Sequence, residues 1–276
     1  MLFKKLLSAA RPSAPASTGA EPDYPLEVEA HVSALHARAP VRRHLDVLYG
    51  DVSIGGECYT DLYFRCLEET GTVVTPFNVF QRFQTRHDLI RYFVATFEVA
   101  GGRVECGAYR GATALLLCRL ARSLRPDFQG EAFYLIDSFS GTSESSEADF
   151  IPVREPSGAT RMQPFFPPRK SDVSASEVRE RFREFPQARV VEGWIPQVFG
   201  ELPEQPWAFV HLDLTLYDAT LAALAYFYDR LSAGGVLVVD GSVFCPGARA
   251  AIDAFSARRD VPYVALGHRE AVFLKS

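Results

Sequence analysis

Four carboxylates in this chain come at or directly after short apolar runs: Glu105, Asp137, Asp213 and Asp240. Such runs are typical of strands buried in a parallel sheet. Taken singly, each acid could be a helix N-cap or a solvated loop residue. The carboxyl ends of parallel strands, however, meet at one edge of a sheet, and ligands of open α/β sheets bind there. Four acids at that edge therefore predict a common ligand site.

The loop that begins at Glu105 and ends at Thr113 contains Gly107, Tyr109 and Gly111. Glycines let a backbone bend sharply and approach a ligand closely. The G-x-x-x-G spacing lacks the third glycine of the dinucleotide fingerprint G-x-G-x-x-G, and the acid at its start would repel a pyrophosphate. A carboxylate suits a cationic ligand instead, such as one with an ammonium and a sulfonium group. We expect these residues to contact a cofactor of that kind.

Two further strand ends carry groups suited to a nucleoside. Asp137, followed by Ser138 and Phe139, ends the second strand, where an acid can accept hydrogen bonds from both hydroxyls of a ribose. Gly193 and Trp194 follow the third strand and could line an adenine pocket, although Trp194 could equally be a core residue. The spacing fits any nucleoside cofactor.

Asp213 and Asp240 end two strands that should be neighbours in the sheet. Together they could hold one divalent cation such as Mg²⁺, with waters completing the octahedron. Asp213 could instead act as a general base on a hydroxyl group. His211 lies two residues earlier, on the same side of the strand, and could assist Asp213 or be a hydrogen-bonded, semi-buried histidine.

Only a sheet covered on both faces would bring these residues together, and the pattern after residue 102 predicts one. Short apolar runs alternate with helical patterns, as in βαβ units of an α/β protein. Strands are expected at 103–106, 132–136, 189–191, 207–212 and 236–239, and a closing hairpin at 261–266 and 271–274. Helices are expected at 112–124, 174–185, 219–231 and 248–255, the third of them stopped by the glycine pair at 234–235.

The rest of the chain suggests appendages to this domain. Residues 1–25 have the composition of a flexible arm. Residues 26–85 predict a helical cap, with helices at 26–48 and 59–67, and a further helix at 88–99 opens the main domain, 86–276. The long segment 141–172 is expected to be a lid. Its basic residues could meet an anionic acceptor or form a solvated charge run: Arg154, Arg161, Arg169 and Lys170.

Composition excludes several classes of function. The 276 residues carry a formal charge of −5, which argues against a nucleic-acid partner. No run approaches the ~18 apolar residues of a membrane span, and the start lacks the apolar core of a secretory signal. Five scattered cysteines without C-x-x-C spacing favour reduced thiols in the cytoplasm. The aromatic residues of the first third predict a homo-oligomer contact: Tyr59, Tyr63, Phe64, Phe77 and Phe80.

Several of these motifs together resemble class I S-adenosylmethionine-dependent methyltransferases, and more narrowly the macrocin O-methyltransferase (TylF-type) family. The resemblance covers roughly residues 76–276. It is carried by residues 104–107 with 110–111, then 137–141, 212–213, 216–217 and 220, 231–235 and 247–253.

The resemblance implies a Rossmann-like, mostly parallel seven-stranded sheet with a reversed last hairpin. It also implies that the methionine part of the cofactor lies against Glu105, Gly107 and Gly111, with the ribose on Asp137 and the adenine near Gly193 and Trp194. The family usually has a second acid where this chain has Thr215, and another where it has Gly241. These departures leave open a lost Mg²⁺ site, a changed acceptor or lost activity.

The leading hypothesis is therefore an S-adenosylmethionine-dependent O-methyltransferase that acts on a hydroxyl of a small-molecule acceptor, such as a sugar or natural product. A catalytically degenerate protein of the same fold, which binds the cofactor or a partner without turnover, is the alternative. A third hypothesis is a nucleotide-sugar or nicotinamide enzyme on a similar sheet. The missing third glycine and the presence of Glu105 both argue against it.

Overall fold

The computed structural model describes residues 53–54, 56–73, 79–242, 245–267 and 270–276. The expected arm at 1–25 and the helix expected at 26–48 lie outside these ranges. Within them, no helix combines the length and the apolar character that crossing a bilayer requires.

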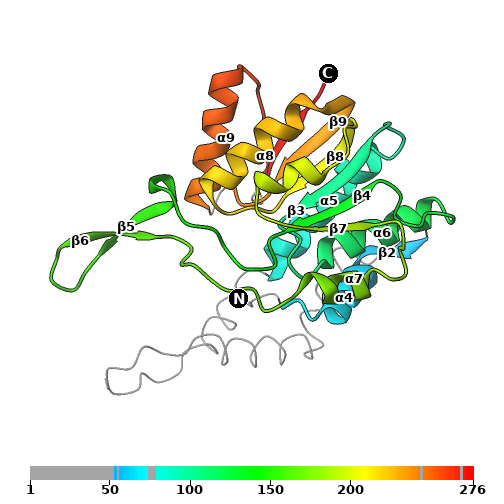
Figure 1. The fold of residues 1–276 in the computed structure, drawn as a ribbon, viewed down its shortest axis with the longest axis horizontal. Helices are drawn as coiled ribbons and strands as arrows, with labels where there is room; N and C mark the ends of the chain where they lie inside the picture. The colour runs from blue at the N-terminus through cyan, green and yellow to red at the C-terminus, as the bar shows by residue number, and fades with distance from the viewer. Residues whose placement is uncertain (1–52, 55, 74–78, 243–244, 268–269) are drawn as a thin grey trace, which may run out of the picture.

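A seven-stranded sheet lies at the centre of the fold, in the order β10-β11-β9-β8-β3-β4-β7 (Figure 1). The neighbours from β9 to β7 pair in parallel, whereas β11 runs antiparallel to both β9 and β10. The Rossmann-like sheet with a reversed last hairpin is thus confirmed. Its strands are β3 (Gly102–Cys106), β4 (Phe133–Asp137), β7 (Arg189–Glu192), β8 (Trp207–Leu212), β9 (Leu231–Val239), β10 (Val264–Ala265) and β11 (Ala271–Leu274).

Helices cover both faces of this sheet, as expected for parallel strands (Figure 1). The helices α8 (Tyr217–Asp229) and α9 (Pro246–Arg259) pack against one face. Four helices build the apolar cluster on the other: α4 (Tyr59–Thr70), α5 (Val79–Ala95), α6 (Ala112–Leu124) and α7 (Ala175–Arg181). Along β4 the side chains alternate between the two clusters, with Phe133 on one side and Tyr134 on the other.

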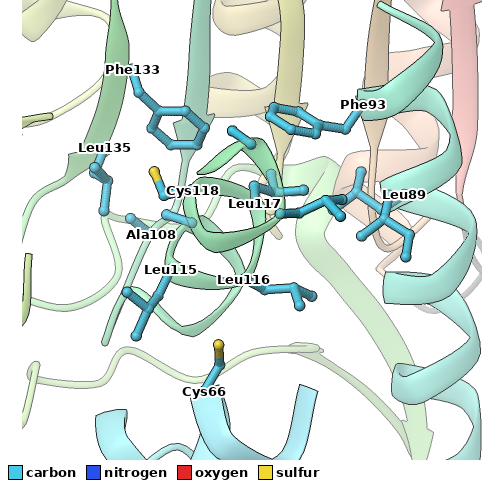
Figure 2. Close-up of a cluster of buried hydrophobic side chains, with 14 of the residues drawn as sticks. Cys66, Leu89, Phe93, Ala108, Leu115, Leu116, Leu117, Cys118, Phe133 and Leu135 are labelled. Carbon is cyan, nitrogen blue, oxygen red and sulfur yellow. The ribbon is translucent and has the colours of Figure 1, made fainter. Parts of the chain in front are cut away.

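Helix α6 is buried on nearly every side. Its consecutive residues Leu115, Leu116 and Leu117 are at most 1% exposed, because the sheet lies on one side of the helix and α4 and α5 lie on others (Figure 2). This packing fixes the start of α6 beside the β3–α6 loop, which contains Gly107 and lies at the edge of the sheet.

The expected elements are largely present, with one clear correction after α8. The bounds expected for α6 and β8 agree with the structure, and Ser174 forms the expected capping box with Glu177 at the start of α7. The glycine pair, however, does not stop α8, which ends at Asp229. Both glycines lie inside β9, where a Cβ on Gly235 would come 2.8 Å from the Ser232 carbonyl oxygen, so close packing rather than helix termination requires a glycine there.

The segment expected to be an irregular lid contains regular structure. A short 3-10 helix η1 (Glu147–Asp149) leads into an antiparallel hairpin of β5 (Phe150–Arg154) and β6 (Thr160–Pro164), which projects from the body (Figure 1). Buried Asp149 anchors its base by accepting a hydrogen bond from the Tyr217 backbone N–H at the start of α8 (2.8 Å).

The first third differs from expectation in two respects. The helix expected at 88–99 is α5, which begins at Val79 and runs through the boundary expected after residue 85. Of the aromatic residues expected at a subunit contact, Tyr59 and Tyr63 are at most 3% exposed and pack against Phe83, so they offer no surface to a partner. Phe77 and the side chain of Phe80 lie outside the described part.

Candidate functional site

A cavity of about 480 Å³ opens at the carboxyl ends of β3, β4, β7 and β8. This volume lies in the usual range for small-molecule sites. Its position is the one expected for ligands of an open α/β sheet. Seven of the residues expected at the site line it: Gly107, Tyr109, Asp137, Ser138, Gly193, Trp194 and Asp213.

Gly107 brings the β3–α6 loop into close contact with the end of β8. Its φ is +85°, and a Cβ there would lie 2.2 Å from the Asp213 carbonyl oxygen. The Asp213 N–H in turn donates to the Cys106 carbonyl (2.9 Å). Since any larger residue would push these two strand ends apart, glycine is required for the shape of the cavity.

The carboxylate of Asp137 is held by backbone donors on both sides. The Tyr109 N–H donates to its Oδ2 and the Phe139 N–H to its Oδ1, each at 2.8 Å. Burial raises the pKa of Asp137, while these hydrogen bonds oppose that shift. A carboxylate has about four lone-pair sites, so this one retains capacity for two further donors, such as the hydroxyls of a ribose.

Trp194 offers an aromatic surface to the same cavity. It is 40% exposed, unlike a core tryptophan, and it lines the cavity beside Gly193. The Gly193 N–H donates to the Asp137 carbonyl (2.9 Å), which ties the end of β7 to the end of β4. The structure thus places the aromatic ring and the acid on one cavity.

The two ends of the 141–172 segment also border this cavity. Gly141 and Thr142 meet Arg169 there, and the Thr142 N–H donates to the Arg169 carbonyl (3.0 Å). At the rim, Asp172 accepts a hydrogen bond from the Tyr109 hydroxyl (2.8 Å) and pairs with Arg110 (2.9 Å). Of the four basic residues named from the sequence, Arg169 and Lys170 line the cavity, whereas Arg154 and Arg161 lie on the projecting hairpin.

Four residues expected to contact the cofactor lie elsewhere. Glu105 is 2% exposed and its Oε1 is 3.0 Å from the His211 Nδ1. Gly111 packs against Phe182. Phe139 contributes its backbone N–H to Asp137 while its ring is buried. Thr113 borders a separate hollow of about 40 Å³. Among the described residues, these side chains are not brought onto the cavity.

The pair expected to bind a metal is brought together, but with an arginine between its members. Arg86, on α5, donates from Nη2 to the Asp213 Oδ2 (2.7 Å) and from Nη1 to the Asp240 Oδ2 (3.0 Å). Although burial lowers the pKa of Arg86, Asp213 and Asp240 outweigh that effect and raise it. The guanidinium is therefore charged and compensates both acids.

The residues present do not fit Mg²⁺. Ligand atoms of His211, Asp213 and Asp240 lie within 4.8 Å of one another, yet the Arg86 guanidinium bonds the two carboxylates that would hold the ion. In addition, Mg²⁺ usually keeps several waters in its shell, whereas His211 and Asp240 are at most 1% exposed. Thr215 and Gly241 supply no replacement carboxylate.

Two residues of this region were missed from the sequence. The sequence does contain an indication for Arg86, because this residue shares one helix face with Phe83, Ile90 and Phe93, all of which are buried. A charged residue on an apolar face needs a buried partner. Glu270 is fully buried and lies one residue before the start of β11. No pattern in the sequence around it indicates a site. Desolvation by burial, with Asp240 nearby, raises its pKa to about 9.

Comparisons with known proteins bear on the family and the fold of the chain. The family model described as Macrocin-O-methyltransferase (TylF) matches residues 79–265. Demethyldecarbamoylnovobiocin O-methyltransferase of Streptomyces niveus is 28% identical over 167 residues, which cover 59% of this chain and 61% of that protein. Mycinamicin III 3''-O-methyltransferase of Micromonospora griseorubida is 24% identical over 168 residues, which cover 59% and 63%.

The matches therefore span less than two thirds of these curated relatives. Among solved structures, the calicheamicin methyltransferase CalS11 shares the fold with a TM-score of 0.59 at 16% identity, over 96% of this chain and 99% of that one. The O-methyltransferase NovP gives a TM-score of 0.54 at 21% identity, over 76% and 87%.

Proposed function

The chain belongs to the macrocin-O-methyltransferase (TylF) family, and on that premise we propose that it transfers a methyl group from S-adenosylmethionine to a hydroxyl of a small-molecule acceptor. The acceptor class would be a sugar or natural product, as the names of the matched relatives indicate for those proteins.

The observation that carries the proposal is the environment of Asp137. Its two oxygens are oriented by the Tyr109 and Phe139 N–H groups and face a cavity that Trp194 also lines. This arrangement suits an adenosine, whose ribose hydroxyls would donate to Asp137 and whose base would lie against the Trp194 ring. Gly107 would let the backbone approach the methionine part.

Bound S-adenosylmethionine would supply an activated, electrophilic methyl group. The chain's own contribution is then to hold an acceptor oxygen in line with that methyl, which removes much of the entropic barrier. Asp213 lines the cavity and would take the proton of the acceptor hydroxyl as its oxygen forms the new bond to carbon. His211, buried against Glu105, would position the strand that carries Asp213.

A second candidate function is supported by the state of Asp213. Its Oδ2 is paired with the Arg86 guanidinium, and no acid stands at Thr215 or Gly241. A protein that binds the cofactor without turnover would show these features as well. The two candidates share the cofactor cavity and differ only in the chemical step.

The deciding experiment has two parts. Calorimetry with S-adenosylhomocysteine should show binding to the full chain and its loss in Asp137→Ala. Mass spectrometry should then detect a gain of one methyl on a hydroxylated sugar or glycoside when S-adenosylmethionine is added. Binding without methylation of any acceptor in a broad panel supports the second candidate, and equal affinity in the wild type and the variant contradicts both.

Homo-oligomerisation, a cytoplasmic location and the lid role of residues 141–172 stay predictions. Sedimentation of the full chain tests the first of them, because a dimer and a monomer of 30.6 kDa subunits separate clearly.

A further inference from the structure

The ends of β8 and β9 bring together side chains of the kinds that bind metal ions. His211, Asp213 and Asp240 place one nitrogen and two carboxylate oxygens within 4.8 Å, a donor set that suits Mn²⁺ or Zn²⁺. Glu105 lies 3.0 Å from the His211 Nδ1. Such a carboxylate–histidine pair is the arrangement that usually orients a metal-binding imidazole.

The second imidazole nitrogen of His211, Nε2, is also of interest for a metal ion. His211 is fully buried, and its Nε2 has no hydrogen-bond partner among the described residues. A buried, unpartnered nitrogen is costly. With Nδ1 held by Glu105, Nε2 is the nitrogen of this imidazole that is left available to a ligand.

Arg86 supplies the positive charge that these acids need. Its side chain is 6% exposed, and two different nitrogens reach carboxylates at the ends of two different strands. Each acid therefore has a short, charge-assisted hydrogen bond. A metal ion between the same two oxygens would require the guanidinium to leave.

We propose that the Arg86 guanidinium is a built-in cation that takes the position of a divalent metal between Asp213 and Asp240, so that the protein binds no metal there. The further consequence that any methyl transfer is metal-independent rests on the proposed function.

The test uses the full chain and Mn²⁺, with binding followed by calorimetry and by the electron paramagnetic resonance of free Mn²⁺. The wild type should bind no Mn²⁺ at this site, and its melting temperature should be unchanged by EDTA or Mg²⁺. Arg86→Ala should gain Mn²⁺ affinity by at least about tenfold, and the added ion should restore part of the melting temperature that the variant loses.

Matched variants make the result specific. Arg86→Met removes the charge but keeps a long side chain, and it serves where Arg86→Ala does not fold. Adding Asp240→Asn to either variant should abolish the gained Mn²⁺ affinity. Stoichiometric Mn²⁺ binding by the wild type that Asp240→Asn removes would overturn the proposal, as would folded Arg86 variants that gain no affinity.

These outcomes do not depend on catalysis. If the chain methylates an acceptor, EDTA should leave the rate unchanged, and a rate that EDTA abolishes and Mg²⁺ restores contradicts the proposal. If the chain methylates nothing, the proposed function fails while the Mn²⁺ measurement still decides the role of Arg86.

Discussion

Asp137 and Asp213 stand at equivalent places, each at the end of a parallel strand and each on the same cavity, yet they are held in different ways. Asp137 is held by two backbone N–H groups from loops beside its own strand. Asp213 is held by a side chain that comes from α5, 127 residues away. The first carboxylate keeps its charge available to a ligand, whereas the second shares its charge with a fixed internal cation. The role of each carboxylate is therefore set by the hydrogen-bond donor that it contacts and not by its position at a strand end.

Removing the internal cation should have the largest effect on stability. Arg86→Ala leaves two buried or half-buried carboxylates without their shared partner, so we expect the free energy of unfolding to fall by about 3–5 kcal/mol. Urea denaturation measures this. Arg82→Ala, one turn earlier on α5, is the matched control and should cost less than about 1 kcal/mol; equal losses would show that the ion pair is not what matters.

Removing Asp137 should weaken cofactor binding rather than the stability of the fold. Asp137→Ala deletes the acceptor for two hydroxyl groups, so the affinity for S-adenosylhomocysteine should fall by about 100-fold or more. Binding to the wild type should also weaken as the pH falls through the pKa of Asp137, which burial raises above the ordinary aspartate value. Calorimetry at several pH values checks both effects, and an unchanged affinity in the variant would break the comparison.

Glu270, near Arg86 and Asp240, should make the stability of the protein depend on pH. Burial, with Asp240 nearby, raises its pKa from 4.5 to about 9. The folded state therefore keeps a proton that the unfolded state has lost between these pH values, and stability should fall as the pH rises through this window. Glu270→Gln removes that slope, which is about 1.4 kcal/mol per pH unit. Urea denaturation across the window, wild type against variant, tests it; parallel curves would contradict the assignment.

The smallest effect is expected at the rim. Asp172 pairs with Arg110 at 2.9 Å, against 2.7 Å for Asp213 and Arg86, but the Asp172 side chain is 56% exposed. Solvent screens such a pair, so Asp172→Asn should change the free energy of unfolding by less than about 1 kcal/mol. A loss as large as that of Arg86→Ala would show that burial does not separate the two ion pairs.

The fold could be predicted well because its signals are local. The apolar periods of α6 and β8 and the capping box at Ser174 each depend on neighbours within one or two turns of chain. The glycine pair at 234–235 was misjudged for the same reason. Gly235 is required by close packing inside β9 and Gly234 by its φ of +77°, and neither glycine marks the end of α8.

By itself, the sequence determined the parallel sheet and the shared edge of its strand ends, and it predicted Gly107 and Asp137 at a ligand site there. Periodicity and strand direction suffice for these features, because every parallel strand delivers its carboxyl end to the same edge. Only the tertiary structure decided what each acid meets. Arg86 is 127 residues from Asp213 and 154 from Asp240 along the chain, and a contact of that length follows from how α5 packs on the sheet. For that reason the sequence predicts a metal site at Asp213 and Asp240, whereas in the folded protein both acids form ion pairs with Arg86.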